Sequence, residues 1–375
     1  MEHPHEWRTA MRLALTLMVR DEIDVVGAML DHHLAQGVDV VIVTDNGSVD
    51  GTAELLQGYA DRGLIELRHD PVHRKQQASL VTAMARAAAA DFGADWVINA
   101  DADEFWLPEA AGLTLKQAFE GIPAEVRTFQ ASVDDMVGPP ASEGTGLQRL
   151  VYRDHRPLEV INELGIHAHP TPDAPHVGTA DVEVVQGNHY TNLEQGAPVP
   201  AGFEVEVLHF PWRSWRQFST KVRNAGEAYE RSGLTPSPNH HGMRDYRRLL
   251  GGTLFPLYLA RHPDAQEMAD AAAGGLVFDD RVARSIPSPV ADVPFEDADE
   301  VARLRTVGRT IAATESTLAR TERRLAETQR LLDEERELAV RRQADYDELA
   351  NRFNALSRRP VVRAADSAAR LLHRG

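Results

Sequence analysis

One ten-residue stretch constrains the fold of this chain most, because an apolar run stops there directly at a group of carboxylates. Trp96–Ala100 has the continuous apolar character of a strand buried on both faces, and Asp101-Ala102-Asp103-Glu104-Phe105 follows it. Open α/β sheets bind ligands at the carboxyl ends of their strands. Asp101 and Asp103 offer two oxygen ligands at a spacing that suits a divalent cation carrying a diphosphate. A strand that ends in a solvated acidic turn explains the same residues equally well, so the rest of the chain has to decide.

The composition excludes several classes of partner and chemistry. The formal net charge of −17 argues against nucleic acid as a partner, because phosphate binding needs basic surface. The chain has no cysteine, which excludes disulfides, thiolate metal sites and a cysteine nucleophile. No stretch reads as a secretory signal peptide, and none approaches the ~20 apolar residues of a membrane-spanning helix. We therefore expect a soluble cytoplasmic protein.

Strands and helices alternate through the first part of the chain. Apolar runs predict strands at 13–19, 38–43, 64–67 and 95–100, and helical periodicity predicts helices at 23–36, 52–60 and 73–91. This alternation predicts right-handed crossovers, a mainly parallel sheet and an α/β fold with helices on both faces. Three strands end in polar residues, at 20–22, 45–50 and 101–104, which should meet at one edge of the sheet. The sequence has neither a dinucleotide-binding G-x-G-x-x-G after the first strand nor a phosphate-binding G-x-x-x-x-G-K-[ST] loop.

Four motifs in this order resemble the family 2 glycosyltransferases, which have the GT-A nucleotide-diphospho-sugar transferase fold. The family reads Lys-Asn-Glu after the first strand, where this chain has Arg20-Asp21-Glu22, a conservative departure. It reads Asp-Asn-Gly-Ser-x-Asp-Gly-Thr after the second strand, and residues 45–52 match throughout. Its bacterial branch with an Asp-Ala-Asp-Glu-Phe signature matches residues 101–105 in full, and that branch's His-Phe-Pro-x-Arg-Ser-x-x-Gln-Phe-x-x-Lys-Val segment is similar to residues 209–222. The resemblance covers residues 11–252.

The resemblance implies a nucleotide-diphospho-sugar donor held by these loops. Asp45 would accept a hydrogen bond from the base or ribose, Asn46 and Gly47 would shape the turn, and Asp50 would either contact the donor or cap the following helix. The residues expected to contact the donor are Arg20, Glu22, Asp45, Asn46, Gly47, Asp50, Lys75, Gln76, Asp101, Arg213 and Lys221. Arg213 and Lys221 would neutralise the diphosphate; a solvated cationic helix face is the alternative for both.

A divalent cation, Mn²⁺ or Mg²⁺, is also implied, because a sugar that leaves a diphosphate builds negative charge on the phosphate oxygens. In this DXD motif Asp103 is the expected direct ligand, and Asp101 would bind the ribose or share the metal through water. His209, after a predicted strand at 203–208, would close the metal site, and imidazole suits Mn²⁺ better than Mg²⁺. A hydrogen-bonded histidine packed by neighbouring aromatic residues is the alternative for His209.

The acceptor and the catalytic base are less defined by the sequence. The family resemblance implies inversion at the anomeric carbon, and an inverting transferase needs a carboxylate to deprotonate the acceptor hydroxyl. Glu163, Asp135 and Glu104 are the candidates, although Glu104 could instead fix its own loop. His167 and His189 lie in polar, aromatic segments that suit a glycan or lipid-linked acceptor, with ordinary surface histidines as the alternative.

The second half of the chain changes character. Helices are predicted at 244–260 and 263–273, and the proline- and acid-rich stretch at 279–299 reads as a linker. Apolar residues then recur every seventh position, which predicts a coiled coil and a homo-oligomer, although the companion seam is poor; these positions are Leu304, Ile311, Leu318, Leu325, Leu332, Ala339, Tyr346 and Phe353. A basic amphipathic tail, 358–375, suggests contact with anionic lipid at the inner face of the membrane.

We therefore expect a GT-A glycosyltransferase domain at 1–275, a linker at 276–299, a coiled coil at 300–357 and the tail at 358–375. Within the first domain, 11–107 would bind the nucleotide, and 108–275 would bind the acceptor and close the metal site. The predicted function is metal-dependent transfer of one sugar from a nucleotide-diphospho-sugar to a glycan or lipid-linked acceptor. The alternative is a non-catalytic oligomeric scaffold at the membrane surface, which the heptads and the basic tail favour and the intact acidic motif disfavours.

Overall fold

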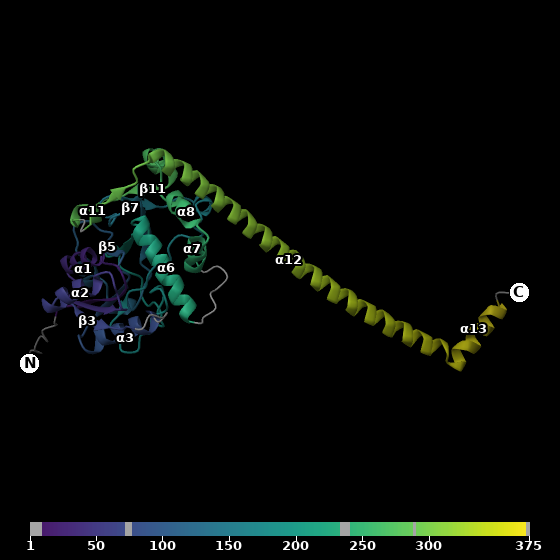
Figure 1. The fold of residues 1–375 in the computed structure, drawn as a ribbon. Coiled ribbons are helices and arrows are strands. Elements are labelled where there is room, and N and C mark those ends of the chain that lie inside the picture. Colours follow the sequence, from purple (N-terminus) through teal and green to yellow (C-terminus); the bar gives the residue numbers. More distant parts are fainter. Residues whose placement is uncertain (1–9, 72–76, 233–240, 288–289, 373–375) are drawn as a thin grey trace, which may run out of the picture. The chain divides into compact units, whose positions relative to one another are not determined.

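The computed structural model describes residues 10–71, 77–232, 241–287 and 290–372, and the chain divides into two compact units, residues 1–313 and residues 314–375 (Figure 1). The first unit contains the sheets and all three apolar clusters. The second unit is helical.

The first sheet has the strand order β3-β2-β1-β4-β9. Four strands run parallel and a short fifth pairs antiparallel with β4: β1 (Leu13–Val19), β2 (Val40–Asp45), β3 (Glu66–His69), β4 (Trp96–Ala100) and β9 (His176–Val177). The crossovers are made by α1 (Val26–Ala35), α2 (Thr52–Asp61) and α3 (Gln77–Ala90). The predicted α/β fold class with a mainly parallel sheet is confirmed.

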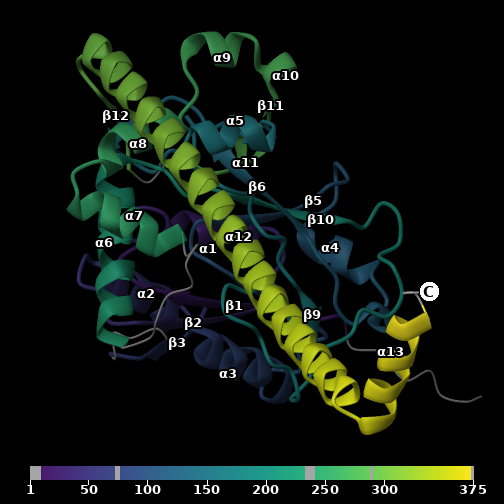
Figure 2. The ribbon, with the colours of Figure 1, turned by 90° about the vertical axis from the view of Figure 1, so that its right-hand side faces the viewer.

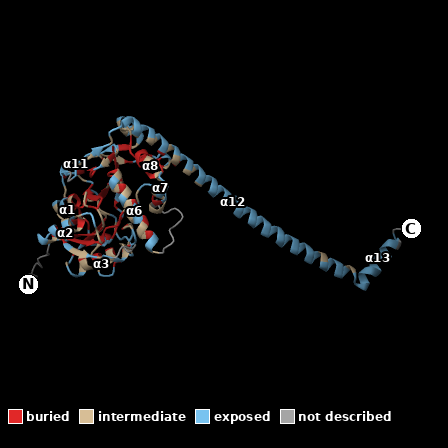
Figure 3. Ribbon diagram, viewed as in Figure 1, coloured by how far each residue is buried: buried red, intermediate tan, exposed pale blue. Residues whose placement is uncertain are grey.

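Strand alternation divides the apolar core between the two faces of this sheet. Leu13, Leu15 and Leu17 of β1 pack in one cluster with α1 and α2, whereas Ala14 packs in another with α3. β1, β2 and β4 are buried along almost their whole length, as Figure 3 shows for the middle of the first unit, whereas no residue of β3 is buried. Burial on both faces is the reason that these strands read as continuous apolar runs in the sequence.

The second sheet has the order β11-β8-β6-β10-β5. Its strands are β5 (Glu104–Pro108), β6 (Ser132–Val137), β8 (Tyr152–Asp154), β10 (Val205–His209) and β11 (Leu276–Phe278). β10 runs parallel to β6 and antiparallel to β5, so it joins the strand that follows the acidic motif to the rest of the sheet. A separate antiparallel pair is formed by β7 (Ala141–Glu143) and β12 (Val293–Pro294).

Arginine–carboxylate pairs connect the strands of the second sheet. Arg153 of β8 lies 2.7 Å from Glu206 of β10, 2.9 Å from Asp279 after β11 and 3.1 Å from Asp134 of β6. Arg281 contacts Glu206 at 2.6 Å and Asp279 at 2.7 Å. We call Asp134, Arg153, Glu206, Asp279 and Arg281 the sheet network.

Three longer helices pack beside this sheet: α6 (Trp215–Ser232), α7 (His241–Leu250) and α8 (Leu254–Arg261). Phe218 of α6, Tyr246 of α7 and Tyr258 of α8 share one apolar cluster. A Cβ atom at Gly226 would lie 2.1 Å from the Tyr246 ring, so the approach of α6 to α7 requires glycine there.

The second half differs from the sequence expectation in its element boundaries. The helix expected at 244–260 is split into α7 and α8, and Gly252 at the break has a φ of +73°. The helix expected at 263–273 is split into α9 (Ala265–Ala269) and α10 (Ala271–Gly274). The expected linker contains β11, α11 (Arg281–Ser285) and β12, and its Val282 and Ile286 are buried in the main core. The other short helices are α4 (Leu115–Glu120), the 3-10 turn η1 (Ala124–Val126) and α5 (Leu158–Glu163).

The predicted long C-terminal helix is confirmed as α12 (Ala298–Ser357), and α13 (Pro360–Leu372) follows it (Figure 2). Gly308 and Ala312 near its start are buried, so this part of α12 belongs to the first unit. The heptad residues beyond it, such as Leu318, Leu325 and Leu332, are exposed. None of the helices in the described ranges combines the length and apolar character needed to cross a bilayer.

Candidate functional site

The strand order of the first sheet marks one place for a ligand. β1 has β2 on one side and β4 on the other, so the direction in which strands are added reverses between β1 and β4. Ligands bind at such a switch point, outside the carboxyl ends of the strands. The residues at 20–22 follow β1 there, those at 101–103 follow β4, and Asp45 ends β2 beside β1. The three polar loops therefore meet at one edge, as the alternation of strands and helices predicts.

Local hydrogen bonds hold the loop after β2. The backbone amide of Ser48 donates to Oδ1 of Asp45 (3.2 Å), and Arg20 donates to the carbonyl of Asn46 (2.7 Å). Gly47 has a φ of +71°, which favours glycine. These contacts agree with a turn-shaping role for Asn46 and Gly47 and place the Arg20 guanidinium against the loop.

Asp50 is engaged by the start of a helix. Its Oδ1 accepts hydrogen bonds from the amide and hydroxyl of Thr52 at 2.9 and 2.6 Å, and its Oδ2 accepts one from the amide of Ile23 at 3.1 Å. The N-cap position of α2 is Gly51, so Asp50 acts from one residue earlier. With both oxygens occupied, Asp50 is better explained by the helix start than by donor contact.

Asp21 joins three segments of the site, which the sequence does not reveal. Its two carboxylate oxygens accept hydrogen bonds at 2.8 Å, one from the amide of Val49 in the β2 loop and one from the Asn224 side chain of α6. Its φ of +54° is unusual for a residue other than glycine. Such a backbone conformation persists only where surrounding contacts enforce it.

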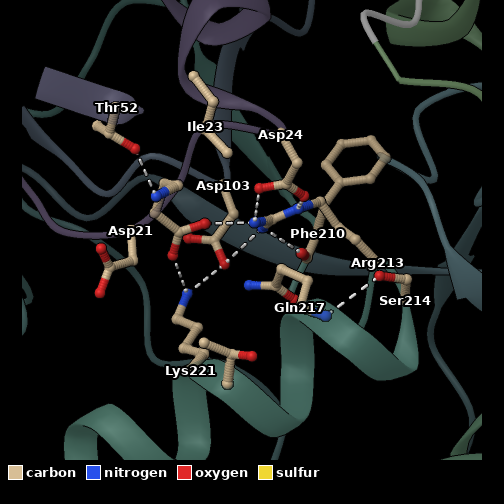
Figure 4. A network of polar contacts seen from close by, with 12 residues as sticks. Asp21, Ile23, Asp24, Thr52, Asp103, Phe210, Arg213, Ser214, Gln217 and Lys221 are labelled. Atoms are coloured by element: carbon tan, nitrogen blue, oxygen red, sulfur yellow. Dashed lines mark hydrogen bonds and ion pairs between the residues drawn. The ribbon is translucent and has the colours of Figure 1, made fainter. Parts of the chain in front are cut away.

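Five charged side chains form a connected cluster that we call the site network: Glu22, Asp24, Asp103, Arg213 and Lys221. Figure 4 labels all of them except Glu22. The Lys221 ammonium lies 2.5 Å from Oδ2 of Asp103 and 3.5 Å from Oε1 of Glu22. The Arg213 guanidinium lies 3.3 Å from Asp103, 2.9 Å from Asp24, and also binds Glu22. Helix α6 and the segment before it thereby close over the carboxyl ends of β1 and β4.

The two cations of the site network differ in exposure. Arg213 is fully buried, whereas the Lys221 side chain is 41% exposed. A guanidinium without solvent contact anchors carboxylates, which does not agree with the direct donor contact expected of Arg213. Burial raises the pKa of the Glu22 carboxyl despite Arg213 and Lys221. Burial acts the same way on Asp103, but there Lys221, His209 and Arg213 together outweigh it and hold the pKa well below its usual range.

Asp101 is surrounded by amide groups instead of cations. The side chains of Gln77 and Asn188 donate to its Oδ1 at 3.0 and 3.3 Å, and its own backbone amide donates to Glu104 at 2.9 Å. Burial is the main cause that raises the pKa of Asp101 to about 6, and the neighbouring Asp103 adds to the effect. Burial, followed by Asp173, raises the pKa of Glu104 well above its usual range. Glu104 thus contacts its own loop through the Asp101 amide.

His209 bridges two carboxylates. β10 pairs it with Glu104 of β5 on one side and with Asp135 of β6 on the other. Its Nδ1 lies 2.7 Å from Asp135, and its Nε2 lies 3.7 Å from Asp103. Burial lowers the pKa of the imidazole, but Asp103 and Asp135 outweigh this effect and the pKa lies well above its usual range. Of the three candidate bases, Asp135 is therefore the one that His209 connects to Asp103.

These atoms fit a resident divalent cation poorly. Oδ2 of Asp103 has cations beside it, Oδ1 of Asp101 accepts from two amides, and both nitrogens of His209 face carboxylates. Oδ1 of Asp103 is buried without a hydrogen-bond partner in the described part of the chain, so it offers a metal ion one free ligand. Nowhere in the described residues do three His, Asp or Glu side chains group for metal binding. Asp101, Asp103 and His209 thus do not form a set of three metal ligands within the described residues, and their role in metal binding stays a prediction.

The remaining predicted residues lie farther from this cluster. Glu163 is the last residue of α5, and Nδ1 of His167 lies 3.1 Å from Asn162 of the same helix. The contacts described for Asp101 and Asp103 do not involve α5. His189 lies 2.9 Å from Asp173, whose charge acts on Asp101 and Glu104, so His189 is one residue removed from the acidic loop. Lys75 and Gln76 lie outside the described residues.

Sequence reasoning does not identify two of the site residues, Asp24 and Asp173. Both come from segments without a motif, and only the fold brings them to the site. Asn188, which precedes His189 in the polar, aromatic segment, is 2% exposed and has a φ of +64°.

Residues 17–126 match the family model described as glycosyl transferase family 2. The matched segment contains the loops after β1, β2 and β4. A comparison with curated proteins found no match.

Solved structures that align with this chain include S. aureus TarS 1-349 in complex with UDP-GlcNAc, at 14% identity over 70% of this chain and 83% of that one, with a TM-score of 0.34. Glucosyl-3-phosphoglycerate synthase from Mycobacterium tuberculosis, crystallised with Mn²⁺, UDP and glucosyl-3-phosphoglycerate, aligns at 14% identity over 71% of this chain and 88% of that one, with a TM-score of 0.26. Likeness at this level carries no argument about donor, metal or acceptor. Residues 17–126, which contain three of the four motif loops, are similar to glycosyl transferase family 2.

Proposed function

We propose that the chain transfers one sugar from a nucleotide-diphospho-sugar donor to the hydroxyl of a glycan or lipid-linked acceptor, with inversion at the anomeric carbon. The observation that carries the proposal is the meeting of three motif loops at the switch point between β1 and β4. Asp45 is the proposed contact for the base or ribose, and Asp101 the proposed contact for the ribose. The remaining donor contacts are proposed for Arg20, Glu22 and Lys221.

In the proposed step, the oxygen of the acceptor hydroxyl forms a bond to the anomeric carbon as the bond from that carbon to the β-phosphate oxygen breaks. The electron pair of the broken bond stays on the phosphate oxygen, so the nucleoside diphosphate leaves with additional negative charge. The hydroxyl proton passes to a carboxylate. Asp135 is our proposed base, because it lies 2.7 Å from Nδ1 of His209, whose Nε2 lies 3.7 Å from Asp103.

Metal dependence is not part of this proposal. The resemblance implies Mn²⁺ or Mg²⁺, which would stabilise charge on the departing phosphate. The described residues around Asp103 instead supply positive charge from Arg213 and Lys221, and Asp103 leaves only its Oδ1 as a ligand for a metal ion.

A donor screen tests the function. We expect one of UDP-, GDP- or dTDP-sugars to be hydrolysed slowly or transferred to an added acceptor, with released nucleotide as the readout. Asp103→Asn should abolish this release, because it removes the anion that orders Lys221 and Arg213. If no donor binds in EDTA, Mn²⁺ or Mg²⁺, the transferase assignment fails.

We also propose that residues 314–357 pair with a second copy of this chain. Leu318, Leu325 and Leu332 are exposed one heptad apart on α12, and a coiled coil would bury them. The contact of the basic tail with anionic lipid likewise stays a proposal, tested by flotation of the full chain with phosphatidylserine vesicles and without them. Unchanged flotation after removal of residues 358–375 would contradict it.

A further inference from the structure

Lysine is rare in this chain, and one of the few lysines lies in the site. Of the 40 Lys and Arg residues only three are lysines, Lys75, Lys116 and Lys221. Arginine is thus the usual cation of this protein, also inside the site, where Arg213 anchors Glu22 and Asp24. An ammonium differs from a guanidinium because it is a compact point charge.

The position of Lys221 is fixed by its helix. Phe218 and Val222 on the same helix are buried in an apolar cluster. Asn224, less than one turn later, donates to Asp21 at 2.8 Å. Before the helix, Arg213 is bound to three carboxylates. The stem of Lys221 therefore starts from an anchored backbone.

The surroundings of the ammonium leave it able to bind an anionic ligand. Two carboxylates lie beside it, Asp103 and Glu22, and an ammonium has three N–H donors. A third donor therefore remains for a phosphate oxygen. The partial exposure of the Lys221 side chain gives a ligand access, which the buried Arg213 does not have.

We propose that Lys221 is the resident cation of the site, held by Asp103 and Glu22 where a divalent metal ion would otherwise bind, and that donor binding and sugar transfer need no metal ion. The proposal rests on the proposed function, since it takes the nucleoside diphosphate of that reaction as the ligand. The competing arrangement is a metal ion that arrives with the donor, binds Oδ1 of Asp103 and displaces Lys221, because Mg²⁺ is commonly held by one or two carboxylates plus substrate phosphates.

Calorimetric titration of the full chain with UDP, GDP and dTDP, in EDTA and again in Mn²⁺, separates the two arrangements. We expect one nucleotide to bind in EDTA with nearly the same Kd as in Mn²⁺. In EDTA, Lys221→Met should weaken binding roughly tenfold to hundredfold, the worth of a charge-assisted hydrogen bond. Lys221→Arg keeps the charge and should retain part of the affinity.

Lys116→Met is the matched control, because Lys116 forms a lysine–aspartate pair with Asp39 (2.6 Å) away from this edge, and its loss should leave the Kd unchanged. Wild-type binding that requires Mn²⁺, or unchanged binding by Lys221→Met in EDTA, overturns the proposal. Thermal melting reports whether each variant folds; if Lys221→Met does not, the EDTA and Mn²⁺ titrations of the wild type still decide. Failure of all three nucleotides under both conditions would instead reject the proposed function.

Discussion

The site network and the sheet network are built from the same chemistry but are organised differently. Each has five members, and each joins elements that are distant in sequence through ion pairs. In the sheet network both cations are arginines, which pair with carboxylates of neighbouring strands. In the site network the buried cation is an arginine, and the half-exposed cation is a lysine at the carboxyl ends of parallel strands.

The difference indicates which network is for stability and which is for a ligand. Guanidinium groups make several fixed hydrogen bonds to carboxylates and suit permanent connections. An ammonium on a flexible stem can add a ligand to its existing partners. Loss of a sheet-network residue should therefore reduce stability, whereas loss of a site-network residue, or of Asp135 beside it, should reduce activity.

The largest effect is expected from two adjacent aspartates. Asp135→Asn removes the proposed base and should lower turnover by about 10²–10⁴-fold. Asp134→Asn removes a partner of Arg153 and should lower the melting temperature with turnover nearly unchanged. Released nucleotide and thermal melting measure both. Equal losses of turnover in the two variants would contradict the proposal that one network supports stability and the other supports activity.

Breaking the sheet network at its centre comes next. Arg153→Met leaves Glu206 and Asp279 without one of their cations and should cost about 3 kcal/mol of the free energy of unfolding. Urea denaturation measures this. Arg216→Met is the control, because its exposed pair with Glu143 should contribute less than about 1 kcal/mol. If both variants lose the same stability, the sheet network is not a structural support.

The pH dependence of the free energy of unfolding tests the role of a buried, uncharged histidine, His32. Burial lowers the pKa of His32 from 6.5 to about 4, although the imidazole donates to the Trp106 carbonyl. Between these values the unfolded chain binds a proton that the folded chain does not, so stability falls as pH drops from 6.5 to 4, by up to about 3 kcal/mol for this residue. His32→Gln should flatten that part of the profile. Parallel urea curves for the two proteins across this range would contradict the assignment.

Removing residues 314–375 should have the smallest effect on catalysis. Both networks lie in the first unit, so turnover on a small acceptor should stay at the wild-type level. Light scattering should show the full chain at a multiple of its 41.4-kDa chain mass and the shortened protein at the mass of one chain, because the exposed heptad leucines are gone. A full chain at the mass of a single copy would contradict the proposed pairing.

The sequence predicts the first sheet well because β1, β2 and β4 are buried on both faces and their polar loops carry motifs. It predicts the second sheet poorly. Ser132–Val137 contains Asp134 and Asp135, and aspartate disfavours strands in isolation. Pairing with β10 and β8, together with the charged partners of both aspartates, overrides that preference. These partners come from distant segments, so no local pattern reveals them.

The candidate site likewise has parts that the sequence predicts and parts that it does not. The loops at Asp45 and Asp101 are predicted, and their edge of the sheet is confirmed by the strand order. The pairing of Asp103 with Lys221 is not predictable from spacing, since 118 residues separate them and the path between them crosses the second sheet. Chemistry read from the motif alone therefore expects a metal beside Asp103, where the fold places an ammonium.

The alternation of Asp134 and Asp135 on β6 also bears on how the chain avoids a mispaired sheet. Asp135 is opposite His209 on one face, and Asp134 meets Arg153 and His155 on the other. A slip of β6 by one residue would exchange the faces of all its side chains. Both aspartates would then lose their partners, so the slip would cost free energy on both faces of the sheet. The charged pairs therefore help to specify the register of β6, because its apolar pattern is too weak to do so alone.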